Sequence, residues 1–127
     1  MIAEGSYSTK ISKKAYPAAT IKFIHPVYED QSVEVEALID SGASATLIPE
    51  SVADQLALVP INKVVMRDFQ GQVVGEKNVY HIKVTIDSLD FDIDVAETAG
   101  FAIIGRDILN KINTTLYGIR QKWEMKK

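Results

Sequence analysis

Cysteine is absent from this chain of 127 residues, and histidine occurs only twice. Without cysteine there is no disulfide framework, no thiolate nucleophile and no cysteine-based metal site. Neither His25 nor His81 has a second histidine or a carboxylate at the spacing of metal ligands in the sequence. We therefore interpret both histidines as surface or capping residues and expect no metal and no cofactor. Hydrolases with a serine or cysteine triad are also disfavoured, because the chain has no cysteine and no histidine in a convincing catalytic context.

Long hydrophobic runs and an excess of positive charge are also missing. The longest apolar run is far below the ~18–20 residues that a membrane span requires, and residues 1–14 lack the apolar core of a secretory signal. Lysine and arginine number 14 against 17 aspartates and glutamates, a net charge of −3, whereas nucleic-acid-binding domains usually carry a basic excess. We expect a soluble cytoplasmic protein that binds neither nucleic acid nor a membrane.

Alternating and β-branched apolar residues are what the chain does contain, and they predict a mostly β fold. Strands are expected over residues 19–24, 32–39, 64–69, 73–86, 89–95 and 101–104, and residues 114–123 are expected to supply one or two more. Short helices are expected over residues 49–58 and 107–112. No clear strand precedes Ala18, so we expect a poorly ordered N-terminal extension, residues 1–17, before one domain that spans 18–127.

Catalytic chemistry is most strongly suggested by the segment Ala37–Ala43, with the sequence Ala-Leu-Ile-Asp-Ser-Gly-Ala. The apolar run should carry Asp40 into a dry environment, where an isolated charge costs several kcal/mol unless it is paired or neutralised. On its own, however, the Asp-Ser-Gly tripeptide is better explained as an ordinary turn at the end of a strand, because aspartate and glycine are favoured in turns.

The surroundings of the tripeptide reverse that preference. Asp40-Ser41-Gly42-Ala43 precedes an apolar pair, a predicted hairpin follows around Gln70-Gly71-Gln72, and Ile-Ile-Gly-Arg-Asp follows about 60 residues later. With these three features in order, the chain resembles the retropepsin-like aspartic proteases over roughly residues 18–123. The resemblance implies an acid protease half-domain: a mostly β, closed β-barrel with one or two short helices.

The same resemblance implies a homodimer and an activity. An aspartic protease needs two carboxylates that share a proton, and this chain has one Asp-Ser-Gly motif, which neither Asp87 nor Asp107 repeats. Asp40 from each of two subunits would meet at a two-fold axis, where one carboxylate accepts a proton from water and the other donates to the peptide carbonyl. The implied function is that of an aspartic endopeptidase acting on peptide or protein substrates.

The resemblance also assigns roles to residues around Asp40. Ser41 would link the two loops across the axis, and Gly42 would allow backbone to approach the carboxylates. The implied site comprises the supporting loop Ser41, Gly42 and Ala43, the cleft residues Leu38, Ser44 and Ile103, the flap residues Phe69, Gln70, Gly71 and Gln72, and the second motif Ile104, Gly105 and Arg106.

Several alternatives stay open. Retroviral enzymes commonly have at position 44 an aspartate that pairs with the arginine of the second motif; here it is Ser44, so Arg106 is alternatively a surface residue at a helix start. The flap is alternatively a plain hairpin in solvent. The sequence departs from the retroviral pattern at position 44, in the longer helical segment over residues 49–58 and at the termini. These departures favour a cellular or bacterial protein, or a retrotransposon enzyme, over a retroviral one. A dimerisation or peptide-binding module with little turnover is the alternative to an enzyme, whereas a small-ligand binder explains neither motif.

Overall fold

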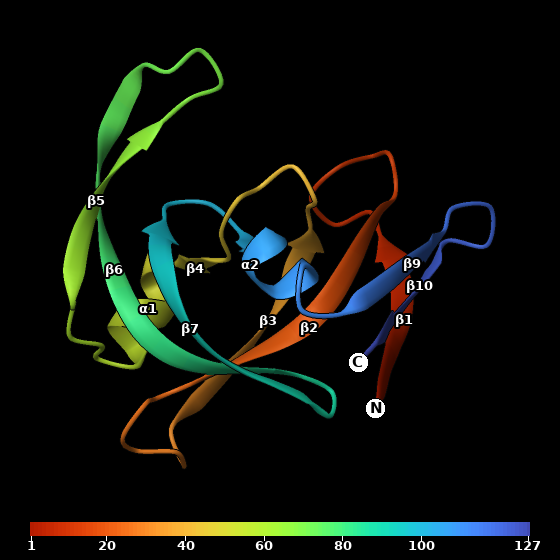
Figure 1. Cartoon of the computed structure of the whole chain (residues 1–127), viewed down its shortest axis with the longest axis horizontal. Helices are drawn as coiled ribbons and strands as arrows, with labels where there is room; N and C mark the ends of the chain where they lie inside the picture. Colours follow the sequence, from red (N-terminus) through yellow and green to blue (C-terminus); the bar gives the residue numbers. More distant parts are fainter.

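The computed structural model covers residues 1–127 and consists mainly of β-strands (Figure 1). The elements in chain order are β1 (Ile2–Ser8), β2 (Tyr16–Ile24), β3 (Ser32–Ile39), β4 (Leu47–Pro49), α1 (Glu50–Gln55), β5 (Asn62–Arg67), β6 (Val73–Ile86), β7 (Leu89–Thr98), β8 (Ala102–Ile104), α2 (Arg106–Leu109), β9 (Asn113–Tyr117) and β10 (Lys122–Lys126). The predicted mostly β class with two short helices is confirmed. Neither helix has the length and apolar character needed to cross a membrane.

All the strands belong to one sheet, in the order β5-β6-β7-β4-β8-β3-β2-β1-β10-β9, and a further pairing of β6 with β2 closes part of this sheet into a ring. Most neighbouring strands are antiparallel, but β3 and β8 are parallel, with Ile39 opposite Ile104. Parallel neighbours end at the same edge of a sheet. The two motifs found in the sequence therefore leave adjacent strands side by side, although about 60 residues separate them.

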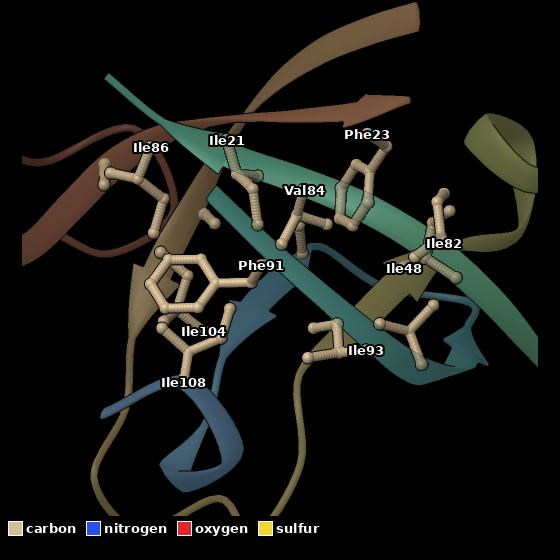
Figure 2. Close-up of a cluster of buried hydrophobic side chains, with 14 of the residues drawn as sticks. Ile21, Phe23, Ile48, Ile82, Val84, Ile86, Phe91, Ile93, Ile104 and Ile108 are labelled. Atoms are coloured by element: carbon tan, nitrogen blue, oxygen red, sulfur yellow. The ribbon is translucent and has the colours of Figure 1, made fainter. Parts of the chain in front are cut away.

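A single hydrophobic core supports these strand ends (Figure 2). Strand β7 shows how the sequence builds it: Phe91, Ile93 and Val95 are buried, while the aspartates between them are exposed. This alternation places every second side chain on one face of the strand. Ile104 on β8 and Ile108 on α2 are fully buried in the same cluster. The second motif is thus anchored directly in the core.

The predicted hairpin is formed by β5 and β6, and its outer half projects beyond the rest of the molecule (Figure 1). A register shift between Met66 and Arg67 interrupts the pairing, and Gly75 on the opposite strand has a φ of +143°. Such a bulge bends a hairpin and increases its twist. At the tip, Asp68 Oδ1 accepts hydrogen bonds from the N–H groups of Gln70 and Gln72, which closes the turn.

Both helices are shorter than the sequence predicts. Helix α1 ends early because Ala57 adopts a φ of +51°, and the Leu58 N–H then donates to the Ala53 carbonyl at 3.1 Å. This bond and the one from the Ala57 N–H to the Asp54 carbonyl are those of a Schellman motif, which ends a helix even where the apolar pattern continues. Helix α2 ends at Leu109, so the expected helix over residues 107–112 is too long.

The N-terminal segment is the main departure from the predicted strands. Strand β1 pairs with β10 and, through Tyr7 and Ser8, with β2. The absence of a strand before Ala18 was therefore a wrong prediction. Only one side chain of β1 is fully buried, so the segment lacks the alternation that identifies a strand in the sequence. The division of the chain into an extension and a domain at residue 18 stays a prediction.

Strand β1 packs on the core through Gly5, which lies directly over the Trp123 ring. A Cβ atom at position 5 would lie 2.6 Å from Trp123 Cζ2. The ring cannot easily move away, because it is buried and its Nε1 donates to the Ala18 carbonyl at 2.8 Å. The absence of a side chain at position 5 is thus a condition for β1 to pair with β10.

We predict that Gly5→Ala lowers the free energy of unfolding by about 1–3 kcal/mol, because the added methyl group overpacks against Trp123. Gly118→Ala is the matched control, since a Cβ at position 118 meets no atom within 4 Å. Urea denaturation followed by tryptophan fluorescence measures both variants. Equal stability of Gly5→Ala and Gly118→Ala would contradict the packing of β1 described above.

Candidate active site

Asp40 is the first residue after β3, at the point where the chain leaves the core. Its N–H donates to the Ile104 carbonyl at 3.0 Å, which continues the pairing of β3 with β8. Its side chain is half-buried, and Oδ1 accepts a hydrogen bond from the Gly42 N–H at 2.8 Å. A Cβ at position 42 would lie 3.1 Å from this oxygen, so glycine suits the tight turn. The second carboxylate oxygen, Oδ2, has no partner within the chain.

The second motif contacts the loop between β3 and β4, residues 40–46, which we call the Asp40 loop. The Arg106 N–H donates to the Ala43 carbonyl at 2.9 Å, and Arg106 Nη1 donates to the Ser41 carbonyl at 2.9 Å. Arg106 therefore uses a backbone carbonyl in place of the carboxylate that the sequence does not offer at position 44. Gly105 is required by close approach, because a Cβ there would lie 2.4 Å from the backbone carbonyl carbon of Ala45.

Two residues to which the sequence analysis assigned no role complete this contact. Thr46 is fully buried, and its N–H donates to both carboxylate oxygens of Asp107 at 3.0 Å. The Thr46 hydroxyl donates to Asp107 Oδ1 at 2.7 Å and accepts from the Gly105 N–H at 3.1 Å. The only signal in the sequence is a threonine beside an apolar pair. That signal does not identify a partner 61 residues away.

A cavity of about 620 Å³ lies between the Asp40 loop and the β5–β6 hairpin. Of the predicted site residues, four line it: Gly42, Ala43, Ser44 and Phe69. Nine of its fourteen lining residues are hydrophobic. The arrangement is a mostly apolar cavity bordered by residues 42–45 of the loop that begins at Asp40 and by the projecting hairpin, while Asp40 and Ser41 themselves do not line it.

Other predicted site residues lie outside this cavity. Leu38 and Ile103 are register partners on β3 and β8 and are half-buried, but they do not line the cavity of the single chain. Ile104 is fully buried in the core. The residues Gln70–Gln72 are exposed at the hairpin tip. The structure therefore brings the loop and the second motif together, whereas of the four predicted flap residues only Phe69 shares a cavity with the loop.

The two histidines have different surroundings. His25 Nδ1 accepts hydrogen bonds from the N–H groups of Val27 and Tyr28 at 3.1 and 3.0 Å, so this residue caps a turn, as the sequence predicts. His81 Nδ1 lies 2.9 Å from Asp94 Oδ1, a partner on β7 that the sequence did not identify. Nowhere do three or more histidine or carboxylate side chains converge as metal ligands would.

We predict that Thr46→Val lowers the free energy of unfolding by about 1–3 kcal/mol, because the buried Gly105 N–H and the Asp107 carboxylate each lose a partner. Thr114→Val makes the same change at a buried hydroxyl that has no hydrogen-bond partner, so it should be neutral or stabilising. Chemical denaturation of both variants measures the difference. A loss of stability in Thr114→Val as large as in Thr46→Val would contradict the role given to the Thr46–Asp107 contact.

Comparisons with known proteins agree with this arrangement. The family described as "gag-polyprotein putative aspartyl protease" matches residues 29–111, which include the Asp40 loop, the hairpin and the second motif. No curated protein matches the sequence significantly.

Several solved structures share the fold. A retropepsin-like aspartic protease from Rickettsia conorii is similar over 98% of this chain and 91% of its own, with a TM-score of 0.62 and 12% identity. The simian foamy virus (mac) protease is similar over 74% of this chain and 92% of its own, with a TM-score of 0.54 and 15% identity. The EIAV protease in complex with the inhibitor HBY-793 is similar over 82% of this chain and 92% of its own, with a TM-score of 0.54 and 15% identity.

Proposed function

The chain belongs to the retropepsin-like aspartic protease family, and on this basis we propose that it is an aspartic endopeptidase whose catalytic group is Asp40. The observation that carries the proposal is the position of this side chain. Asp40 lies on a loop whose next residues line an apolar cavity, and its Oδ2 has no partner within the chain. A carboxylate oxygen left free beside a groove is available for proton transfer to a bound peptide.

In the proposed mechanism, two Asp40 carboxylates share one proton. The ionised one takes a proton from water while the water oxygen bonds to the peptide carbonyl carbon, and the protonated one donates its proton to the carbonyl oxygen. In the second step the newly protonated carboxylate donates its proton to the leaving nitrogen, and the other carboxylate accepts a proton from one hydroxyl of the tetrahedral diol. The carbon–nitrogen bond breaks, which yields a free acid and a free amine and restores the pair with one shared proton. The Gly42 N–H orients one oxygen of each carboxylate, so that the other exchanges the proton.

The proposed mechanism requires a second copy of the chain, because each chain contributes one such aspartate. We place the dimer contact at β9, which ends the sheet and has one edge unpaired. Leu116 on this strand is half exposed and Ile119 in the following turn is fully exposed. Pairing of two such edges about a two-fold axis would satisfy their backbone groups and bury these side chains.

The proposed substrate is a peptide or protein segment in extended form. The hydrophobic lining of the cavity favours apolar side chains next to the bond that is cut. Phe69, which is fully exposed at the hairpin tip, would cover such a segment and exclude water when the hairpin closes. The β5–β6 hairpin is suited to this movement because β5 is an edge strand that pairs only with β6.

We predict that Asp40→Asn lowers kcat/KM by at least ~10²-fold, because an amide cannot exchange the proton. The measurement is digestion of a peptide library followed by mass spectrometry. Asp54→Asn, a change at an exposed aspartate of α1, is the control that should keep full activity. Undiminished cleavage by Asp40→Asn would contradict the assignment, and peptide binding without cleavage by the wild type would favour the binding-module alternative.

The pH dependence of the wild type tests the same mechanism. Because one carboxylate must be protonated and the other ionised, kcat/KM should follow a bell-shaped curve whose two limbs belong to the pair. A rate that rises steadily into the alkaline range would instead indicate hydroxide as the nucleophile.

We predict that specific activity falls more steeply than enzyme concentration on dilution, because each subunit holds half of the site. Leu116→Glu should raise the dissociation constant of the dimer at least about tenfold, since like charges would face each other across the axis. Val59→Glu introduces the same charge at an exposed apolar residue away from β9 and is the control. Analytical ultracentrifugation measures both variants. A fully active monomer would exclude the two-subunit site.

A further inference from the structure

Three charged side chains line the apolar cavity, and two of them already have partners at the hairpin tip. Arg67 Nη1 donates to the Gly71 carbonyl at 2.9 Å, and Asp68 accepts the N–H groups of the turn. Both belong to the hairpin that covers the cavity. The third, Asp94, lies on β7, the strand next to β6, and is the only charged lining residue outside the β5–β6 hairpin.

Strand pairing explains why an aspartate is found at this place. On β7 the core face holds Ile93 and Val95, so Asp94 and Ala96 share the other face, where Asp94 is exposed and Ala96 is buried. Ala96 lies opposite Val79 of β6, and both line the cavity. The apolar wall therefore continues along β7 and ends at the carboxylate of Asp94.

The Asp94 carboxylate is only partly engaged. His81, its register partner on β6, approaches Oδ1 at 2.9 Å, while no lysine or arginine lies within ion-pair distance of either oxygen. The Asp94 side chain is 59% exposed. The contact with His81 orients the carboxylate and leaves Oδ2 free for a cation from outside the chain.

We propose that Asp94 makes this end of the cavity a subsite for a lysine or arginine side chain of the substrate. The inference rests on the proposed function, since it requires a peptide in the cavity. The aliphatic stem of such a side chain would pack along Val79 and Ala96, and its charged head would reach Oδ2 of Asp94. A glutamate at the same substrate position would be repelled. The enzyme therefore prefers apolar residues at the cut and one basic residue nearby.

The test uses the full-length protein and digestion of a peptide library by three forms: the wild type, Asp94→Asn and Asp92→Asn. Asp92 lies on the same face of β7, opposite Lys83 and outside the cavity, so it controls for loss of a surface charge. The wild type and Asp92→Asn should enrich lysine or arginine at one position near the cut, and Asp94→Asn should not. Two peptides that differ only in having lysine or glutamine at that position allow a direct comparison. The kcat/KM for the lysine peptide divided by that for the glutamine peptide should be about three- to tenfold lower in Asp94→Asn than in the wild type.

Charge reversal supplies a second measurement. Asp94→Lys should prefer glutamate over lysine at the same position of the peptide, because the sign of the subsite is inverted. Cleavage by the wild type without any preference for a basic residue, or an unchanged lysine-to-glutamine ratio in Asp94→Asn, would overturn this inference and leave the proposed function intact. Absence of cleavage by the wild type, or full cleavage by Asp40→Asn, would overturn the proposed function and this inference with it.

Discussion

The hydrogen bonds between Thr46 and Asp107 join the two loops on which the candidate site depends. Thr46 is fully buried, and buried polar groups are costly unless every donor and acceptor is satisfied. The Asp107 carboxylate and the Gly105 N–H satisfy the Thr46 side chain, and Gly105 in turn lies against the backbone of Ala45. A contact satisfied in this way has one geometry, which fixes the loop that presents Asp40.

The Asp40 loop and the second motif differ from the β5–β6 hairpin in how they are attached to the rest of the molecule. The loop and the second motif rest on the core through Ile104 and Ile108, whereas the hairpin is paired on one side only and exposes Phe69 completely. Regions with few buried contacts open at low free energy. A carboxylate on a loop supported by the core, next to a hairpin paired on one side only, suits a site that must admit, hold and release a peptide.

How far the sequence predicts the fold depends on how each segment is stabilised. Strands β6 and β7 are stabilised by burial of alternating side chains, and their periodic pattern is visible in the sequence. Strand β1 is stabilised by backbone pairing with β10 and by a glycine that fits over Trp123, so its sequence gives no such signal. Helix α1 is ended by the left-handed conformation of Ala57. Glycine or asparagine usually occupies such a position, so an alanine there does not announce the end of the helix in the sequence.

The sequence by itself determined the mostly β class, the family and the candidate aspartate, because these follow from local pattern and from short motifs. Only the tertiary structure decided what those motifs contact. The Ser41 carbonyl as partner of Arg106, the Thr46–Asp107 contact and the place of Asp94 in the cavity all join residues from separate elements. The parallel pairing of β3 with β8 and the closure of the sheet through β2 and β6 bring them together. No local sequence pattern specifies these long-range pairings.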